Sequence, residues 1–300
     1  MASVRQLLDV AVARLRESGS ETARLDAELL LALALDTDRT GVIAHTDAEV
    51  GDGVIARFEG ALDRRAAGEP VAYIRGFKEF HGLAFGVDPR ALIPRPETER
   101  LVELAELEIV RRLVVAPRAR GAKPIRVIDV GVGSGAVAVT LAVLLRRRKM
   151  LDEVAITGTD TSEDALQLAR ENAVAHAVGD RIEFAREDLL PGGSMDLWDC
   201  VLANLPYVRS AAVPELPKAA SFEPVVALDG GPDGLRLIDR LLAQLPGSLA
   251  HDGVALLEIG ADQAVEMRAL VDERLPGWSC EIELDLGRLP RVAILRRAAA

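Results

Sequence analysis

The second half of the chain alternates between two hydrophobic periods. Short apolar runs of strand length are separated by segments whose apolar residues recur every three to four positions. Such alternation is typical of a mostly parallel sheet with helices on both faces. The last two apolar runs, "SCEIELDL" and "PRVAILRR", indicate an antiparallel closing pair. We therefore expect a Rossmann-like α/β domain over residues 97–300, with a seven-stranded, mostly parallel sheet.

The first 70 residues have the period of helices. Ser3 can cap a first helix, and a second is expected from Ser20. The apolar residues expected along one side of that second helix are Leu25, Leu29, Ala32 and Leu33. The segment Thr46 to Glu49 has the sequence of a capping box and predicts the start of a third helix. Residues 1–70 are therefore predicted to form a small helical domain.

Residues 71–96 change character and are rich in aromatic residues. Their alternation predicts a β-hairpin with strands over Tyr73–Lys78 and Leu83–Val87 and a turn near His81-Gly82. The segment "IPRPE" follows, and its two prolines exclude a regular helix there. We expect this hairpin to link the helical domain to the α/β domain.

Composition and charge exclude several classes of protein. The 300 residues carry a net charge of −11, which argues against a protein that holds nucleic acid by neutralising its phosphates. Two cysteines far apart form neither a disulfide framework nor a zinc cluster, and the four histidines lack metal-ligand spacing. The start of the chain lacks the apolar core of a signal peptide, and no apolar run is long enough to span a bilayer. We expect a cytoplasmic protein with no metal, no membrane contact and no stable nucleic-acid binding.

A glycine-rich loop follows the first strand of the α/β domain and leads directly into a helix. Its key residues are Asp129, Gly131, Gly133 and Gly135. Glycines between a strand and a helix let the backbone approach a ligand closely, beside the unpaired N–H groups of the helix N-terminus. The Gly-x-Gly-x-Gly spacing, with no GK[S/T] after it, disfavours a P-loop and favours S-adenosylmethionine over a dinucleotide. A tight turn without a ligand is the alternative.

Two acidic positions follow the next two strands. Asp160 ends "VAITGTD", where a carboxylate can bind a ribose diol through two hydrogen bonds; it can equally cap the next helix. Asp188 and Leu189 follow the third strand. There the acid can accept from an adenine amino group while the leucine lies against the ring, or the acid can be an ordinary solvated loop residue.

The fourth strand ends in Asn204-Leu205-Pro206-Tyr207, here called the NLPY motif. Pro206 restricts Leu205 to an extended backbone, so the Leu205 carbonyl has a fixed direction. The Asn204 side-chain oxygen is a second acceptor, and Tyr207 can lie flat on a planar group. Two fixed acceptors can hold an NH2 group by both hydrogens, which suits methyl transfer to a planar, weakly nucleophilic nitrogen. A turn that merely closes a strand is the alternative.

Over nearly its whole length the chain resembles the release-factor glutamine methyltransferases (the HemK/PrmC family). The resemblance is carried by "EPVAYIRGFKEFHGLAFGVDPRALIPRPETE", "DVGVGSGAVAVTLA" and "SFEPVVALDGGPDGLRLIDRLL". It implies a protein-(glutamine) N-methyltransferase that uses S-adenosyl-L-methionine on the Gln of the Gly-Gly-Gln (GGQ) loop of class I peptide-chain release factors. It also implies that residues 1–70 recognise the substrate and that Glu97 and Thr98 border the cofactor and substrate pocket.

The chain departs from the family pattern at one position. The family has Asn-Pro-Pro-Tyr, whereas Leu205 stands here in place of the first proline. The chemistry needs only a carbonyl from this residue, but leucine is freer in φ than proline. This departure leaves room for a paralogue acting on a ribosomal protein glutamine, a small amide or an adenine in RNA. It also leaves room for a non-catalytic binding module that kept the fold.

Overall fold

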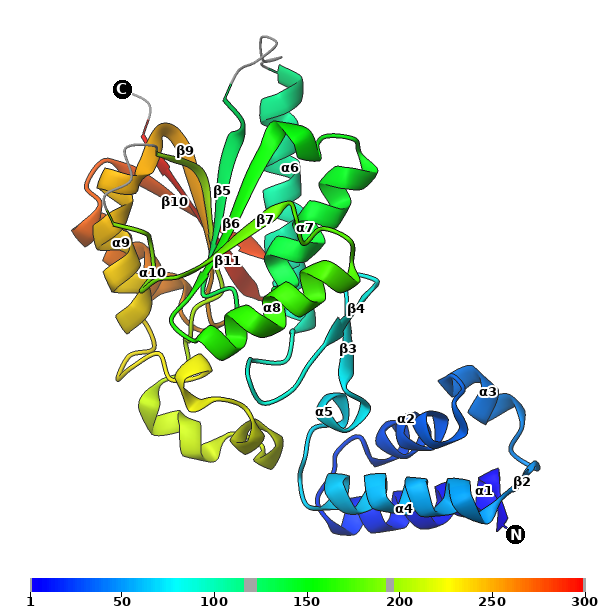
Figure 1. The fold of residues 1–300 in the computed structure, drawn as a ribbon. Coiled ribbons are helices and arrows are strands. Elements are labelled where there is room, and N and C mark those ends of the chain that lie inside the picture. The colour runs from blue at the N-terminus through cyan, green and yellow to red at the C-terminus, as the bar shows by residue number, and fades with distance from the viewer. Residues whose placement is uncertain (1, 116–122, 193–196, 299–300) are drawn as a thin grey trace. The chain divides into compact units, whose positions relative to one another are not determined.

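The computed structural model describes residues 2–115, 123–192 and 197–298 (Figure 1). Its backbone falls into two compact units. The first comprises Met1–Lys78 and Leu216–Glu223, and the second comprises Glu79–Glu215 and Pro224–Ala300. A short segment from the middle of the chain therefore belongs to the N-terminal unit.

The first unit is helical, as its periodicity predicts. Its elements are β1 (Ala2–Ser3), α1 (Val4–Glu17), α2 (Ala23–Leu35), α3 (Arg39–Ala44), β2 (Glu49–Val50), α4 (Asp52–Ala66), α5 (Val71–Arg75) and the 3-10 helix η4 (Lys218–Phe222). Ser3 caps α1 as predicted: its hydroxyl accepts from the Gln6 N–H, and the Gln6 side chain accepts from the Ser3 N–H. The core of this unit is formed by apolar side chains of α1, α2 and α4, among them Leu8, Leu30 and Phe58.

The buried face of α2 differs from the expected one. Leu25 and Leu33 are each 39% exposed, whereas Leu30 and Leu31 are fully buried. The sequence "ELLLALAL" offers apolar residues all around the helix, so periodicity alone does not select a face. Packing against α1 and α4 makes that choice.

The predicted helix start at Thr46 is wrong. Residues Glu49–Val50 form the strand β2, which pairs with β1 at the N-terminus. The carbonyls of Thr46 and Ala48 accept from the first N–H groups of the α1 region, at 2.8 Å from Arg5 N and 3.0 Å from Val4 N. These long-range partners replace the local capping box, and α4 begins only at Asp52, after Gly51.

The first predicted strand of the hairpin is also wrong in part. The structure has the short helix α5 at Val71–Arg75, followed by strands β3 (Phe77–Phe80) and β4 (Leu83–Gly86). Pro70 stands at the N-cap of α5, and Gly76 ends it with a φ of 75°. The turn at His81-Gly82 is as predicted, with both residues in the left-handed region.

The second unit is a seven-stranded α/β domain, which confirms the predicted fold class. Its remaining elements are η1 (Pro96–Thr98), α6 (Glu99–Val115), β5 (Ile125–Val130), α7 (Ala136–Arg147), η2 (Leu151–Glu153), β6 (Val154–Asp160), α8 (Glu163–Ala175), β7 (Ile182–Arg186), β8 (Trp198–Ala203), η3 (Ser210–Glu215), η5 (Val225–Ala227), α9 (Arg236–Ser248), β9 (Leu249–Glu258), α10 (Ala264–Arg274), β10 (Trp278–Leu284) and β11 (Pro290–Arg297). Strands and helices alternate along the chain, as the two hydrophobic periods predict.

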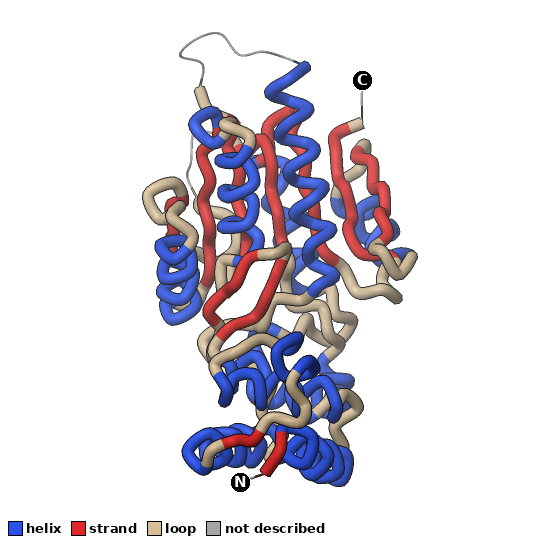
Figure 2. The backbone as a smooth tube through the Cα atoms, turned by 90° about the vertical axis from the view of Figure 1, so that its right-hand side faces the viewer, coloured by secondary structure: helices blue, strands red, loops and turns tan. Residues whose placement is uncertain are grey.

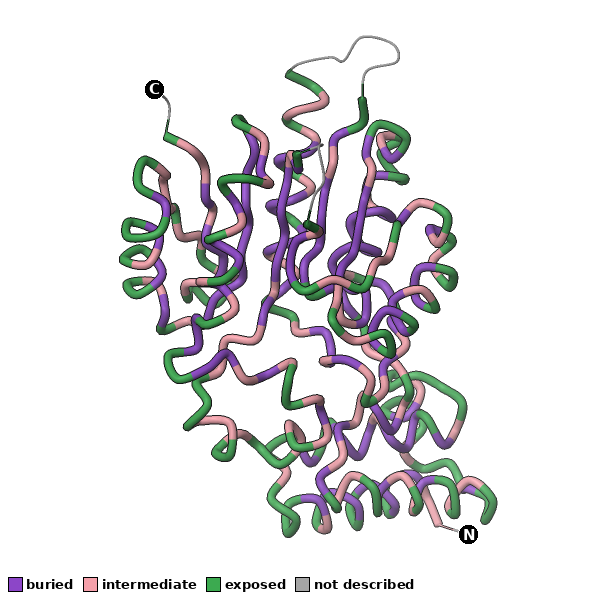
Figure 3. Tube along the Cα trace, turned by 60° about the vertical axis from the view of Figure 1, so that its left-hand side comes forward, coloured by how far each residue is buried: buried purple, intermediate pink, exposed green. Residues whose placement is uncertain are grey.

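The strand order of the sheet is β10-β11-β9-β8-β5-β6-β7. Strands β5 to β9 pair in parallel, and β11 and β10 close the sheet as an antiparallel pair. Helices α6, α7 and α8 pack on one face and α9 and α10 on the other, each over its own apolar core. Figure 2 shows the strands running side by side between these helices, and the central strands are buried along most of their length (Figure 3).

The strand order reverses at β5. The chain moves from β5 outward to β6 and β7, and then returns to the other side of β5 with β8. The loops after β5 and β8 therefore diverge at the carboxyl edge of the sheet. In open α/β sheets this switch point is where ligands bind.

Candidate active site

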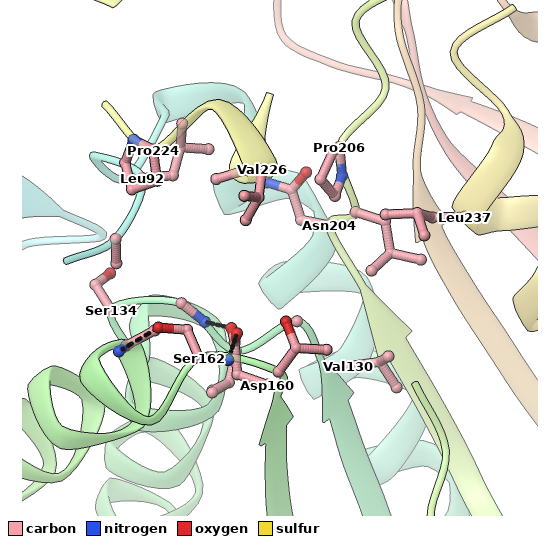
Figure 4. A pocket seen from close by; sticks show the side chains of 18 of the residues that line it. Leu92, Val130, Ser134, Asp160, Ser162, Asn204, Pro206, Pro224, Val226 and Leu237 are labelled. Atoms are coloured by element: carbon pink, nitrogen blue, oxygen red, sulfur yellow. Dashed lines mark hydrogen bonds between the residues drawn. The ribbon is translucent and has the colours of Figure 1, made fainter. Parts of the chain in front are cut away.

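A cavity of about 590 Å³ lies at this carboxyl edge (Figure 4). The loops after β5, β6, β7 and β8 line it, together with residues 90–95 and 224–227 and the start of α9. In Figure 4 the side chains of Asn204 and Pro206 lie on one side of the hollow, and those of Ser134, Asp160 and Ser162 lie on the other. The cavity thus brings together residues that are far apart in sequence.

The glycine loop after β5 turns back on β6. The N–H groups of Gly131 and Val132 both donate to the Thr159 carbonyl at 2.8 Å. Gly131 and Gly133 have φ values of 73° and 53°, a region that favours glycine, and both line the cavity. The loop therefore presents bare backbone to whatever occupies the cavity.

Gly135 has a different role from the other two glycines. It stands at the N-cap of α7 with a φ of 83°, and among the described residues it is not part of the cavity lining. A Cβ at this position would lie 3.2 Å from Ala169 in α8. The glycine lets α7 and α8 pack closely, so its direct part in ligand binding stays a prediction.

Asp160, at the end of β6, binds both the glycine loop and the residue that caps α8. Its two carboxylate oxygens accept from Gly133 N at 3.0 Å and from Ser162 N at 2.9 Å. Ser162, and not Asp160, is the N-cap of α8, and its hydroxyl accepts from Ala165 N. The capping alternative for Asp160 is therefore set aside, and its carboxylate lines the cavity.

Asp129 lies beneath the glycine loop and is 2% exposed. Its carboxylate accepts from Ala138 N in the first turn of α7 at 3.1 Å. Burial, with a smaller contribution from the charge of Asp160, raises the pKa of Asp129 to about 7, although the Ala138 hydrogen bond opposes the rise. The floor of the cavity therefore holds a carboxyl group whose charge changes near neutral pH.

Asp188 and Leu189 also line the cavity, after β7. The Asp188 carboxylate pairs with Arg240 of α9 at 2.7 Å and is 60% exposed, so its contact with an adenine stays a prediction. Leu189 is buried with a φ of 72°, and its carbonyl accepts from the Thr159 hydroxyl. This contact ties the loop after β7 to the end of β6.

The NLPY motif forms the other side of the cavity. The Asn204 side-chain amide donates to the Thr98 hydroxyl at 3.0 Å, and Asn204, Leu205 and Pro206 line the cavity. Leu205 is buried and belongs to the core on the α9–α10 face. The side chain at the unusual position of the motif is therefore a packing residue.

Tyr207 is not among the described residues that line the cavity. Its hydroxyl donates to the buried Glu258 carboxylate at 3.4 Å, and its carbonyl accepts from Gln263. Burial, with the nearby Glu258 charge, raises the pKa of Tyr207 to about 12. Glu97 is exposed on η1 and is likewise outside the described lining.

Comparisons with known proteins show which family the chain resembles. A model of the PrmC N-terminal domain matches residues 6–76, and a model of the methyltransferase small domain matches residues 113–218. The chain is 39% identical to a release factor glutamine methyltransferase of Moorella thermoacetica over 89% of each chain. It is 36% identical to one of Koribacter versatilis over 98% of this chain and 99% of that one.

The chain belongs to the release factor glutamine methyltransferases.

The protein is therefore a methyltransferase, as its sequence motifs predict. Among solved structures, the catalytic domain of hMettl16 in complex with an RNA hairpin (MAT2A 3′UTR hairpin 6) has a TM-score of 0.53 and 14% sequence identity. That match covers 80% of this chain and 82% of the other. At this identity the likeness supports the fold alone.

Two residues that contact predicted site residues were not expected from the sequence. Arg240 pairs with Asp188 from α9, where no residue was expected to contact the cofactor site. Glu258 meets Tyr207 from the end of β9. A signal for Glu258 was present, because a lone acid ends the apolar run "GVALLE" at the ligand-binding edge of the sheet.

Two further findings concern residues 2–115, 123–192 and 197–298. Among them no group of three or more His, Cys, Asp or Glu side chains is arranged to hold a metal ion. No helix in this described part is long and apolar enough to cross a membrane.

Proposed function

We propose that this methyltransferase transfers a methyl group from S-adenosyl-L-methionine to the side-chain amide nitrogen of the Gln in the GGQ loop of class I peptide-chain release factors. The relatives that match along nearly the whole chain are named release factor glutamine methyltransferases. The observation that carries the proposal is the Asn204 amide, held by Thr98 at the rim of the cavity that Asp160 also lines.

The cavity suits S-adenosylmethionine in size and chemistry. Its volume of about 590 Å³ lies within the range of small-molecule sites. The Asp160 carboxylate uses two acceptor sites on backbone N–H groups, which leaves two for a ribose diol. Gly131 and Gly133 allow close backbone approach, and Asp188 with Leu189 provides an acceptor and an apolar surface for the adenine. When bound, this cofactor supplies a methyl group on a sulfonium centre, which a nucleophile displaces in line.

The NLPY motif would bind the glutamine side chain. The Asn204 side-chain oxygen and the Leu205 carbonyl are two acceptors for the two N–H groups of the substrate amide. Pro206 restricts the backbone of Leu205 and so directs its carbonyl. Tyr207 would stack on the planar amide, and Glu97 would border the substrate.

The chain's own residues would act mainly by positioning. Holding the amide by both hydrogens aims its nitrogen and prevents rotation of the NH2 group. As the nitrogen becomes tetrahedral its N–H groups become more acidic, so the hydrogen bonds to Asn204 and Leu205 strengthen in the transition state. The same acceptors hold the departing proton until solvent removes it.

Residues 1–70 would recognise the release factor, and the segment 71–96 would link them to the catalytic domain over residues 97–300. The match of the PrmC N-terminal domain model over residues 6–76 supports this division. Because release factors act on ribosomes, the reaction would take place in the cytoplasm.

The test is transfer of labelled methyl groups to a purified class I release factor, beside the same factor with its GGQ Gln changed to Ala. Peptide mass analysis then locates the label. Label on the GGQ peptide of the unchanged factor alone is the expected result. Equal labelling of both factors would overturn the proposed target, and so would no labelling by an enzyme that binds the cofactor.

A further inference from the structure

Glu258 is a carboxylate buried behind the NLPY motif. It ends β9 and is 1% exposed. In the β8–β9 ladder Ala203 pairs with Leu257, so Glu258 lies one step further along, beside Asn204. Its Oε2 atom has no hydrogen-bond partner in the described part of the chain. A buried acid that is only partly satisfied is costly, and such groups cluster at functional sites.

The nearest cation does not neutralise Glu258 directly. Arg291 of β11 acts on it through its charge, but the guanidinium pairs with Asp285 at 3.2 Å and donates to the Ile259 carbonyl. Glu258 is therefore held mainly by neutral donors, and those donors belong to the active site.

Two hydroxyl groups reach the Glu258 carboxylate. Tyr207 donates to Oε1 at 3.4 Å, and the Thr98 hydroxyl lies near enough to the carboxylate to lower its pKa. Thr98 is itself buried, and its oxygen accepts from the Asn204 Nδ2 group at 3.0 Å. Thr98, which acts on the Glu258 carboxylate, is therefore also hydrogen-bonded to the side-chain amide of Asn204.

We propose that Glu258 is a positioning residue that determines, through Thr98, which end of the Asn204 amide faces the substrate. The inference rests on the proposed function, in which the Asn204 oxygen accepts a hydrogen from the substrate NH2 group. It assigns to Glu258 no contact with the substrate or the reacting atoms.

The orientation of Asn204 depends on how many hydrogens Thr98 can donate. An ionised carboxylate only accepts, and the Thr98 hydroxyl has a single hydrogen to donate. When that hydrogen is committed to Glu258, the Thr98 oxygen can only accept. Asn204 must then turn its NH2 group toward Thr98, so its oxygen is directed away from Thr98 and toward the cavity.

A neutral residue at position 258 relaxes this constraint, because it offers a donor as well as an acceptor. The Thr98 oxygen can then accept from residue 258 while the Thr98 hydrogen bonds the Asn204 oxygen, and the amide can turn over. It would present its NH2 group to the NH2 group of the substrate, which places donor against donor. The two orientations of an amide have nearly the same shape, so only the hydrogen-bond network separates them.

The charge of Glu258 is poised to change in the neutral range. Burial raises the pKa of Glu258 to about 7; the Thr98 and Tyr207 hydrogen bonds and the charge of Arg291 oppose the rise, and Glu97 adds to it. These four residues, from η1, the NLPY motif and β11, are the groups that act on it. Ionised Glu258 is the active form, so kcat is expected to rise through this range.

A pair of substitutions at Thr98 separates hydrogen bonding from packing. Thr98→Val keeps the shape and loses the hydroxyl, whereas Thr98→Ser keeps the hydroxyl and loses a methyl group. The proposal expects Thr98→Val to have the lower kcat, by roughly tenfold, with equal cofactor affinity for both. If Thr98→Ser were the more damaged variant, packing would explain the contact and the proposal would be wrong.

Glu258→Gln tests the charge itself. At saturating cofactor and pH 8, we expect kcat to fall by roughly 10- to 100-fold, the range for residues that orient a directly acting group. The rise of kcat through neutral pH should also disappear. A Glu258→Gln enzyme with the wild-type pH profile would overturn the proposal.

A measurement without a methyl acceptor keeps this test independent of the proposed function. The protein is labelled with 15N-asparagine, and the Asn204 side-chain NH2 signals are identified by their loss in Asn204→Ala. We expect these signals to shift through neutral pH in the wild type and to stay constant in Glu258→Gln. Signals that respond equally in both proteins would refute the link, whereas failure to methylate a release factor would refute only the proposed substrate.

Discussion

Leu205 of the NLPY motif lies directly against Gly131 of the glycine loop: a Cβ placed on Gly131 would be 3.1 Å from the Leu205 Cδ2 atom. Leu205 is also buried in the core beneath α9 and α10. Residue 205, where the family pattern has proline, therefore joins the two sides of the cavity by direct contact. The leucine side chain fills the space between the NLPY motif and the glycine loop.

This contact predicts a coupling between the two positions. Gly131→Ala should lower the free energy of unfolding by about 1–2 kcal/mol, because alanine is strained at a φ of 73°, and the clash with Leu205 adds to this cost. Leu205→Ala in the same chain removes the clash, so the double variant should be more stable than the sum of the two single changes by roughly 0.5 kcal/mol or more. Urea unfolding of the wild type, the two single variants and the double variant measures the coupling. Strictly additive changes in the free energy of unfolding would show that the two residues do not interact.

Gly135 is predicted to matter for stability rather than for cofactor affinity. Gly135→Ala forces a Cβ to 3.2 Å from Ala169 at a φ of 83°, and should cost about 1–3 kcal/mol. The matched control is Gly60→Ala in the middle of α4, where a Cβ meets nothing within 4 Å; it should stabilise by about 0.5–1 kcal/mol. If Gly135→Ala were as stable as the wild type but bound the cofactor more weakly, Gly135 would instead have a direct role in ligand binding.

Substitutions on the two sides of the cavity should separate cofactor binding from transfer. Asp160→Ala removes the acceptor of Gly133 N and of the proposed ribose diol, so calorimetry should show a loss of cofactor affinity. Asn204→Ala should leave that affinity nearly unchanged while kcat falls by about 10²- to 10³-fold, as for loss of one oriented group that acts in the transition state. An equal fall of cofactor affinity in both variants would make Asn204 a structural residue.

Asp129 predicts how stability depends on pH. Its folded-state pKa is raised from 3.8 to about 7, so the folded protein binds this proton more tightly than the unfolded chain does. Its contribution to stability is complete below pH 3.8 and is lost as pH rises through 7. Asp129→Asn keeps an acceptor for Ala138 N and does not titrate, so urea unfolding should show the variant gaining stability relative to wild type between pH 5 and pH 8. Glu258 titrates in both proteins and cancels in this comparison; a constant difference would contradict the prediction.

Much of the fold could be predicted because its signals are local. The alternation of apolar runs and helical segments predicted the seven-stranded domain, and Ser3 predicted the start of α1. Two predictions were wrong because a stronger partner overrides a weak local pattern. Near Thr46 the backbone pairs with the distant strand β1, and within Tyr73–Lys78 the helix α5 forms between Pro70 and Gly76. Local propensity decides an element only when no stronger tertiary partner competes for its backbone.

By itself the sequence determined which residues bear the chemistry: the glycine loop, Asp160 and the NLPY motif are recognisable because each follows a strand in a βα unit. Only the tertiary structure decided which other side chains contact these residues. Thr98 meets Asn204 across 106 positions, and Tyr207 meets Glu258 across 51. Thr98 reaches Asn204 from η1, outside the sheet, whereas Tyr207 and Glu258 come together because the strand order places β8 and β9 side by side. That order is set by packing over the whole sheet, which no local pattern in the chain encodes.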